Sequence, residues 1–166
     1  MIYAGIGSRE TPPAIQRLMA AIAQQRAQQG WTLSSGGAMG ADRAFDWGCS
    51  MEHGKKRIFL PSDDIPEWAF LDAERNHPNW PACTTFARRA HARNSLIIYG
   101  RDRNELCSLV ICWTKGAATV GGTGQALRIA YRESIEVHNL ASQRWLDHYT
   151  LALKEPPSHA PYSIPS

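Results

Sequence analysis

The stretch "TLSSGGAMGADRAFD", residues 32–46, places three glycines and two serines between a short apolar run and an amphipathic one. Each glycine costs conformational entropy when the chain folds, so this concentration of them needs a physical reason. The pattern predicts a strand that ends in a glycine-rich turn and continues as a helix. A turn of that kind presents backbone N–H groups at the start of a helix, where they can bind an anion.

The same order of strand, turn and helix recurs on both sides of this stretch. We expect strands at residues 2–8, 31–35, 56–62, 106–113 and 135–141, and helices at residues 10–30, 40–54, 84–100, 121–134 and 142–155. Residues 63–82, with three prolines and two tryptophans, interrupt the rhythm and are expected to form a partly helical excursion over the sheet edge. Strands that alternate with helices predict an α/β fold, with a parallel sheet of about five strands between two layers of helices.

The length and composition are those of one globular domain. The chain has 166 residues, of which 43% are hydrophobic and 20% charged, and its net charge is +3. We expect a single domain over residues 1–154 and a mobile, proline-rich tail over residues 155–166. No apolar run approaches the ~20 residues of a membrane-spanning helix, and the amino terminus has no secretory signal pattern. A cytoplasmic location and no membrane partner are therefore expected.

The four cysteines show no CxxC pair and no histidine at zinc-finger spacing, so we expect reduced core thiols and no metal site. Arginine is concentrated between residues 88 and 103. A guanidinium can donate two parallel hydrogen bonds to one phosphate, although a solvated helix face is an equal explanation for any single arginine of this group. The arginines concerned are Arg88, Arg89, Arg93, Arg101 and Arg103.

Three predicted strands end in glycine, at residues 4–9, 34–42 and 120–126. The carboxyl ends of parallel strands lie on one edge of a sheet, so the three turns should converge there and form a phosphate site. The alternative is that each glycine only permits a tight turn. None of the turns matches GxGxxG with its later acidic residue, and none carries Gly-Lys-Ser/Thr, so NAD-dependent chemistry and ATP hydrolysis lose support.

These residues resemble the Rossmann-like SLOG superfamily, which includes the DNA-processing protein A (DprA/Smf) family and the lonely-guy (LOG) phosphoribohydrolases. "YAGIGSR" resembles its first-strand motif and "SGGAMGAD" its second-strand loop. "RRAHARNSLII" is similar to both the RNRII segment of the first family and the MHxRK segment of the second, and "VGGTGQA" lies where the second carries PGGxGTxEE. The resemblance covers residues 2 to about 140.

The resemblance implies nucleotide binding at the edge of a Rossmann-like sheet, with no required cofactor. It assigns Arg93 to an anion, but Leu127 and Arg128 stand where the lonely-guy pattern has its glutamates. Related proteins commonly pair, which makes a homodimer a further expectation. The residues expected to contact the ligand or its phosphate are Gly7, Ser8, Arg9, Ser35, Gly36, Gly37, Met39, Gly40, Asp42, Arg93, Asn94, Gly121, Gly122, Thr123, Gly124 and Gln125.

Three functions remain open at this point. The first is binding of a nucleotide or nucleotide-derived ligand, whose base Trp68 or Trp80 could stack against. The second is hydrolysis or transfer at an N-glycosidic bond of a nucleotide, with Asp42 the best catalytic candidate among Asp42, Asp46 and Glu133. The third is single-stranded nucleic-acid binding through the arginine segment, which a net charge of +3 supports only modestly.

Overall fold

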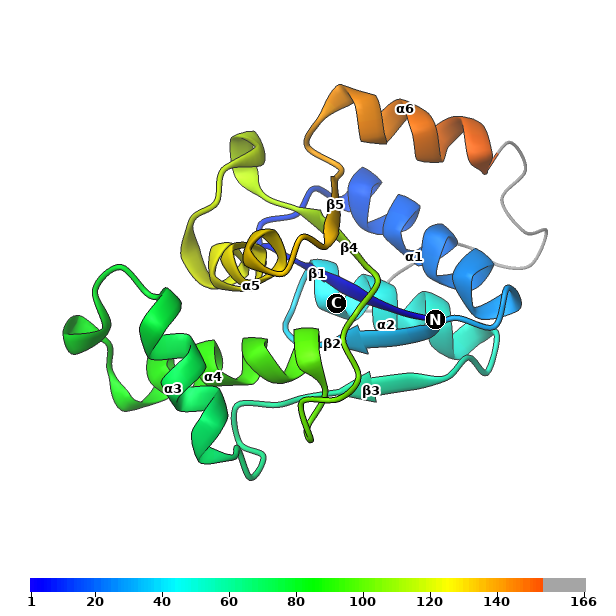
Figure 1. Ribbon diagram of the computed structural model, residues 1–166. Coiled ribbons are helices and arrows are strands. Elements are labelled where there is room, and N and C mark those ends of the chain that lie inside the picture. The colour runs from blue at the N-terminus through cyan, green and yellow to red at the C-terminus, as the bar shows by residue number, and fades with distance from the viewer. Residues whose placement is uncertain (154–166) are drawn as a thin grey trace.

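The computed structural model describes residues 1–153, which form an all-parallel, five-stranded sheet in the order β3-β2-β1-β4-β5 (Figure 1). The chain starts in the central strand, winds outward to β3, and then returns past β1 to build the other half. This arrangement confirms the predicted α/β fold with a parallel sheet. The strands are β1 (Ile2–Gly7), β2 (Thr32–Ser35), β3 (Lys56–Ile58), β4 (Leu109–Trp113) and β5 (Glu136–Asn139).

Helices cover both faces of the sheet. One face is covered by α1 (Pro13–Gln28) and α2 (Ala41–Met51), with α6 (Gln143–Ala152) packed beside α1 (Figure 1). The opposite face carries α4 (Thr85–Tyr99) and α5 (Gly121–Arg132). Residues 1–153 also contain two short 3-10 turns, η1 (Trp80–Ala82) and η2 (Lys115–Ala117). The expected tail, residues 155–166, lies outside the described residues. No helix within residues 1–153 is both long and apolar enough to cross a membrane.

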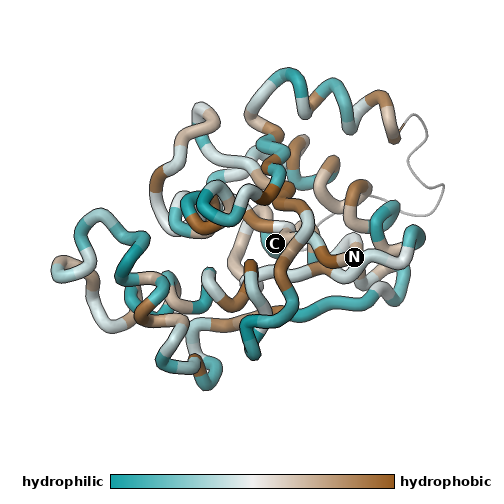
Figure 2. Tube along the Cα trace, viewed as in Figure 1, coloured by the Kyte–Doolittle hydropathy of each residue, from teal (hydrophilic) through white to brown (hydrophobic). Residues whose placement is uncertain are grey.

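The alternation of side chains along the strands divides the core into two clusters. Tyr3 of β1 packs toward α1 and α2, whereas its neighbours Ala4 and Ile6 pack toward α4 and α5. In β4, Ile111 faces the first side and Val110 the second. Because both faces of the inner strands are buried, β1 and β4 are apolar on both faces, whereas β2 buries the two polar side chains of Ser34 and Ser35. Figure 2 shows the apolar stretches of chain gathered along these strands.

The excursion predicted over the sheet edge packs instead on helices. Its main element, α3 (Glu67–Asn76), contacts α4 and α5 and forms an additional layer outside them (Figure 1). Ala69 and Ala73 of α3 are fully buried against Leu96 of α4. These small residues on the inner face of α3 allow close contact with α4, so the segment packs on the helical layer and not on the sheet edge.

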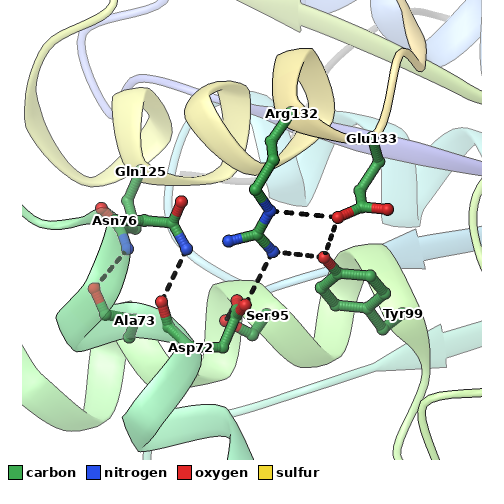
Figure 3. Close-up of polar contacts among 8 residues, drawn as sticks. All are labelled: Asp72, Ala73, Asn76, Ser95, Tyr99, Gln125, Arg132 and Glu133. Carbon is green, nitrogen blue, oxygen red and sulfur yellow. Dashed lines mark hydrogen bonds and ion pairs between the residues drawn. The ribbon is translucent and has the colours of Figure 1, made fainter.

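A polar network fastens α3 to this position (Figure 3). The Asp72 carboxylate accepts hydrogen bonds from Ser95 Oγ at 2.7 Å and from Arg132 Nη2 at 2.7 Å. Arg132 also donates to the Tyr99 hydroxyl and to Glu133, and Tyr99 donates to Glu133 Oε1 at 2.7 Å. Asp72 is only 5% exposed, so its charge is compensated by partners from two other helices.

We expect Asp72→Ala to lower the free energy of unfolding by about 2–3 kcal/mol. The substitution leaves the buried Ser95 hydroxyl without its hydrogen-bond acceptor and removes a charged partner of Arg132. Asp64→Ala is the matched control: Asp64 also pairs with an arginine, Arg101, but its side chain is 93% exposed. Urea unfolding followed by circular dichroism measures both. Equal effects of the two substitutions would contradict a structural role for the network.

Candidate functional site

A cavity of about 540 Å³ opens at the carboxyl edge of the sheet, between the loops that follow β1 and β4. These two strands are neighbours, yet the helix after β1 lies on one face and the helix after β4 on the other. Such a reversal leaves a crevice at the strand ends, the usual ligand position in open α/β sheets. The lining also includes residues of the turn after β2 and of α4, so the three glycine-rich turns do meet at one cavity.

The amino terminus of α5 faces this cavity without a cap. Gly121, Gly122 and Thr123 line the cavity, and their N–H groups have no acceptor within residues 1–153. Val120, which precedes the helix, offers no side-chain cap to them. The unpaired N–H groups and the helix dipole make this end of α5 a positive, donor-rich wall.

The glycines at this end of α5 are not explained by packing. A Cβ built on Gly122 would have no heavy atom within 4 Å, and the same holds for Gly121, although its φ of +67° favours glycine. Gly124, one turn further, differs because a Cβ there would lie 2.7 Å from the Thr119 backbone. Gly122 therefore leaves space that no residue of the described chain occupies.

The glycines of the first two turns are explained by contacts within the chain. A Cβ on Gly7 would lie 2.6 Å from the Ala41 Cβ, and a Cβ on Gly36 would overlap the Arg93 guanidinium. Gly40 has a φ of +83° and approaches the Ser8 carbonyl oxygen. At these positions glycine lets two chain segments approach each other, a reason that differs from both the phosphate contact and the tight turn considered from the sequence.

The Asp42 carboxylate accepts hydrogen bonds from backbone amides of the first two turns, including that of Gly7, which was expected to contact the ligand. Its Oδ1 accepts from the Gly7 N–H at 3.2 Å, and its Oδ2 accepts from the Ala38 N–H at 3.3 Å. Asp42 is only 4% exposed, and this burial raises its pKa to about 6, against the lowering effects of the Arg93 charge and the backbone hydrogen bonds. The second turn thus carries its own anion.

Arg93 is used mainly inside the protein. Its Nη1 donates to the carbonyl oxygen of Gly36 and, at 3.0 Å, to that of Phe59. The side chain thereby joins the loops after β2 and β3 to α4, and it lines the cavity while remaining 8% exposed. The next residue, Asn94, donates to the Gly122 carbonyl oxygen at 2.9 Å and so fixes the turn that starts α5.

Part of the set of residues predicted to contact the ligand lines the cavity. The predicted residues in the lining are Gly7, Ser8, Arg9, Asp42, Arg93, Asn94, Gly121, Gly122 and Thr123. The predicted residues outside it are Ser35, Gly36, Gly37, Met39, Gly40, Gly124 and Gln125. Two of these have evident roles in packing: Ser35 Oγ donates to the Gly5 carbonyl oxygen at 2.6 Å, and Gln125 Nε2 donates to that of Ala73 at 2.9 Å.

Sequence reasoning missed several lining residues. Thr114 and Lys115 follow β4 directly, so their position after the most apolar strand was a usable signal. Glu10 also lines the cavity, beside the expected Arg9. Of the other acidic candidates, Asp46 pairs with Lys56 and Glu133 with Arg132, and neither reaches the lining.

The aromatic residues proposed for base stacking lie elsewhere. Trp68 donates from Nε1 to the Arg101 carbonyl oxygen and packs against Tyr99, and Trp80 packs edge-on to His77. His91, on the side of α4 that faces His77, is absent from the cavity lining; burial, together with the nearby His77, Arg128 and Arg93 charges, lowers its pKa to about 4.

The burial of Asp42 predicts a specific pH dependence of stability. Its folded-state pKa, about 6, lies above the ordinary 3.8, so its favourable contribution is fully present below about pH 4 and is lost as the pH rises through 6. Relative to Asp42→Asn, which has no charge at this position, the wild type should lose up to about 3 kcal/mol of stability between pH 4 and pH 7. Urea titrations of both proteins across this range measure the difference, and a pH-independent difference would contradict the raised pKa.

Comparisons of the chain with protein-family models, curated proteins and solved structures found no match. The geometry of the cavity and the chemistry of the residues that line it therefore carry the evidence for a function.

Proposed function

We propose that the protein binds a nucleotide or nucleotide-derived ligand in the cavity between the β1 and β4 loops, with a phosphate group on the amino terminus of α5. The observation that carries this proposal is the row of free N–H groups at Gly121, Gly122 and Thr123, which face a cavity and have no capping side chain among the described residues. An anion there gains hydrogen bonds and the helix dipole at once.

The charges around the cavity favour this end over the start of α2. Asp42 already accepts the N–H groups of Gly7 and Ala38, so a phosphate beside α2 would meet a buried carboxylate. Near α5 the lining instead contains Lys115, an exposed cation on the loop after β4. Arg9 lies on the loop after β1 and adds a second exposed cation to the lining.

The remainder of the cavity suits the other parts of such a ligand. Its volume of about 540 Å³ falls within the range of small-molecule sites. Ile6, Ile97 and Ala126 supply an apolar section of wall against which a base or ribose can pack. Thr114 and Asn94 add polar side chains that can fix the orientation of the ligand.

The substitution Gly122→Asp tests the phosphate position. A carboxylate in the first turn of α5 complements the helix dipole, so the free protein should keep or slightly raise its melting temperature. The same carboxylate repels a phosphate, and we expect binding to weaken at least about tenfold, which corresponds to about 1.4 kcal/mol. A thermal-shift screen of nucleoside mono-, di- and triphosphates identifies the ligand, and calorimetry then measures affinity.

Gly122→Asn is the matched control, because it adds nearly the same volume without the charge. If Gly122→Asp and Gly122→Asn weaken nucleotide binding equally, the added volume and not the charge is responsible. The phosphate then does not lie on the amino terminus of α5. If no nucleotide stabilises the wild type, the proposal fails, since a ligand at a hundred times its dissociation constant should add about 2.7 kcal/mol.

A second candidate function, cleavage or transfer at an N-glycosidic bond, is favoured by Asp42. This carboxyl group lines the cavity, and its pKa of about 6 suits proton transfer near neutral pH. The positions that correspond to the lonely-guy glutamates offer no replacement: Leu127 is fully buried in the core, and Arg128 donates to the Asn76 carbonyl oxygen. Among the described residues, Asp42 and Glu10 are the carboxyl groups that line the cavity, so an acid–base step by a carboxylate there would use one of them.

We expect a hydrolase to release free base from at least one nucleoside monophosphate, and Asp42→Asn to reduce the rate at least about a hundredfold, the usual contribution of a general acid or base. Chromatography of the reaction products measures release. Glu10→Gln is the control for the other carboxylate. Absence of turnover by the wild type on every nucleotide that binds would leave binding as the function and exclude this candidate.

Single-stranded nucleic-acid binding has less support, because the arginines expected to form a basic surface make contacts within the protein. Arg89 donates to the carbonyl oxygens of Pro61 and Asp63, and Arg101 pairs with Asp64. Arg88 and Arg103 lie over the rings of Trp80 and Trp68. We therefore place this function behind the two that use the cavity.

A further inference from the structure

Three potential metal ligands far from the sheet come together between α3 and α4. His77 follows the last residue of α3, Cys83 follows η1, and His91 lies in the middle of α4. Their ligand atoms all lie within 4.8 Å of one another, and each residue is half-buried. Five residues separate His77 from Cys83 and seven separate Cys83 from His91, a spacing without a helical or finger-like pattern.

The distances between these side chains approach those around a metal. The Cys83 Sγ lies 3.7 Å from each of the two ring nitrogens of His77. In a tetrahedral zinc site, a sulfur ligand and a nitrogen ligand are about 3.5 Å apart. The two imidazole rings are tilted by 52°, with their centroids 4.5 Å apart. The ligand atoms therefore lie close enough together for side-chain rotation to bring all three to one ion.

The immediate surroundings position two of these ligands. The Asn79 N–H donates to His77 Nδ1 at 3.1 Å, and Trp80 packs edge-on to the same ring. Coordination by either nitrogen of His77 would replace this one hydrogen bond, because a metal on Nδ1 takes its lone pair and a metal on Nε2 leaves the proton on Nδ1. The Nδ1 of His91 is buried and has no hydrogen-bond partner within the described part of the chain, so a metal would satisfy a polar atom that is otherwise left unpaired.

We propose that His77, Cys83 and His91 bind one zinc ion, with the fourth tetrahedral position open to solvent. A thiolate with two imidazoles is a donor set that zinc prefers over magnesium or calcium, which take oxygen ligands. Zinc sites with three protein ligands and one open position are well known.

The bound ion would fasten residues 77–83 to α4. That helix also supplies Ala90, Arg93 and Asn94 to the cavity, so the ion would stiffen the outer support of the cavity wall without entering the cavity. The site is chemically independent of phosphate binding, because none of its three ligands belongs to the cavity lining.

Cobalt titration of the purified, chelator-treated full chain tests the proposal. Wild-type protein should bind one Co²⁺ per chain and show tetrahedral bands in the visible range with a thiolate charge-transfer band in the near ultraviolet. Zinc should displace the cobalt. The charge-transfer band reports Cys83 specifically, because Cys49, Cys107 and Cys112 are buried with at most 1% exposure. Absence of this band in the wild type would overturn the proposal without any variant.

Three variants complete the test. Cys83→Ser should abolish the charge-transfer band. Both Cys83→Ser and His91→Asn should weaken zinc binding at least about a hundredfold, because loss of a direct ligand costs more affinity than loss of a hydrogen bond to a ligand. His53→Asn is the matched control, since His53 is exposed, lies on α2's side of the sheet and has a φ of +50° that asparagine tolerates. Its zinc affinity should equal that of the wild type. Unchanged affinity in Cys83→Ser, with far-ultraviolet circular dichroism confirming its fold, would overturn the assignment.

Discussion

The carboxyl edge of the sheet depends on one buried carboxylate. Asp42 accepts hydrogen bonds from Gly7, the last residue of β1, and from Ala38 after β2. It thereby joins two segments whose bonded residues lie 31 positions apart in the sequence. Arg93 continues this connection from α4 through the carbonyl oxygens of Gly36 and Phe59, which brings in the loop after β3. Donors and acceptors of three loops are satisfied by two oppositely charged side chains, which limits the cost of burying either charge.

This interaction decides where an external anion can bind. The first turn of α2 contains Asp42, so its N–H groups and dipole are already matched by a charge within the protein. The first turn of α5 contains no acidic residue and no capping side chain among the described residues. Two helix termini therefore converge on one cavity, but only the second is left electrostatically incomplete. Gly122, unlike Gly7 and Gly36, also has empty space where a Cβ would lie.

The sequence predicts the order of elements well, because apolar runs and glycine turns are local signals. The strands Ile2–Gly7 and Leu109–Trp113 and the helix Pro13–Gln28 lie within the ranges 2–8, 106–113 and 10–30 that hydrophobic periodicity predicted. The convergence of the three turns also followed from the general geometry of parallel sheets. Which glycines have open space beside them could not be predicted, because the space beside Gly7 is filled by Ala41 and that beside Gly36 by Arg93, residues brought there only by tertiary packing.

The same limit applies to side chains whose partners are distant in sequence. Arg93 resembles an anion ligand in its local motif, yet its Nη1 is directed to two carbonyl oxygens that lie 57 and 34 residues away. Asp72 carries no motif at all, but its contacts with Ser95 and Arg132 hold α3 against the helical layer. In each case a charged group is buried beside a partner that only the fold supplies. Local motifs therefore identify the edge of the sheet at which the cavity forms, whereas the pairing of buried charges determines which helix terminus at that edge is left without a partner within residues 1–153.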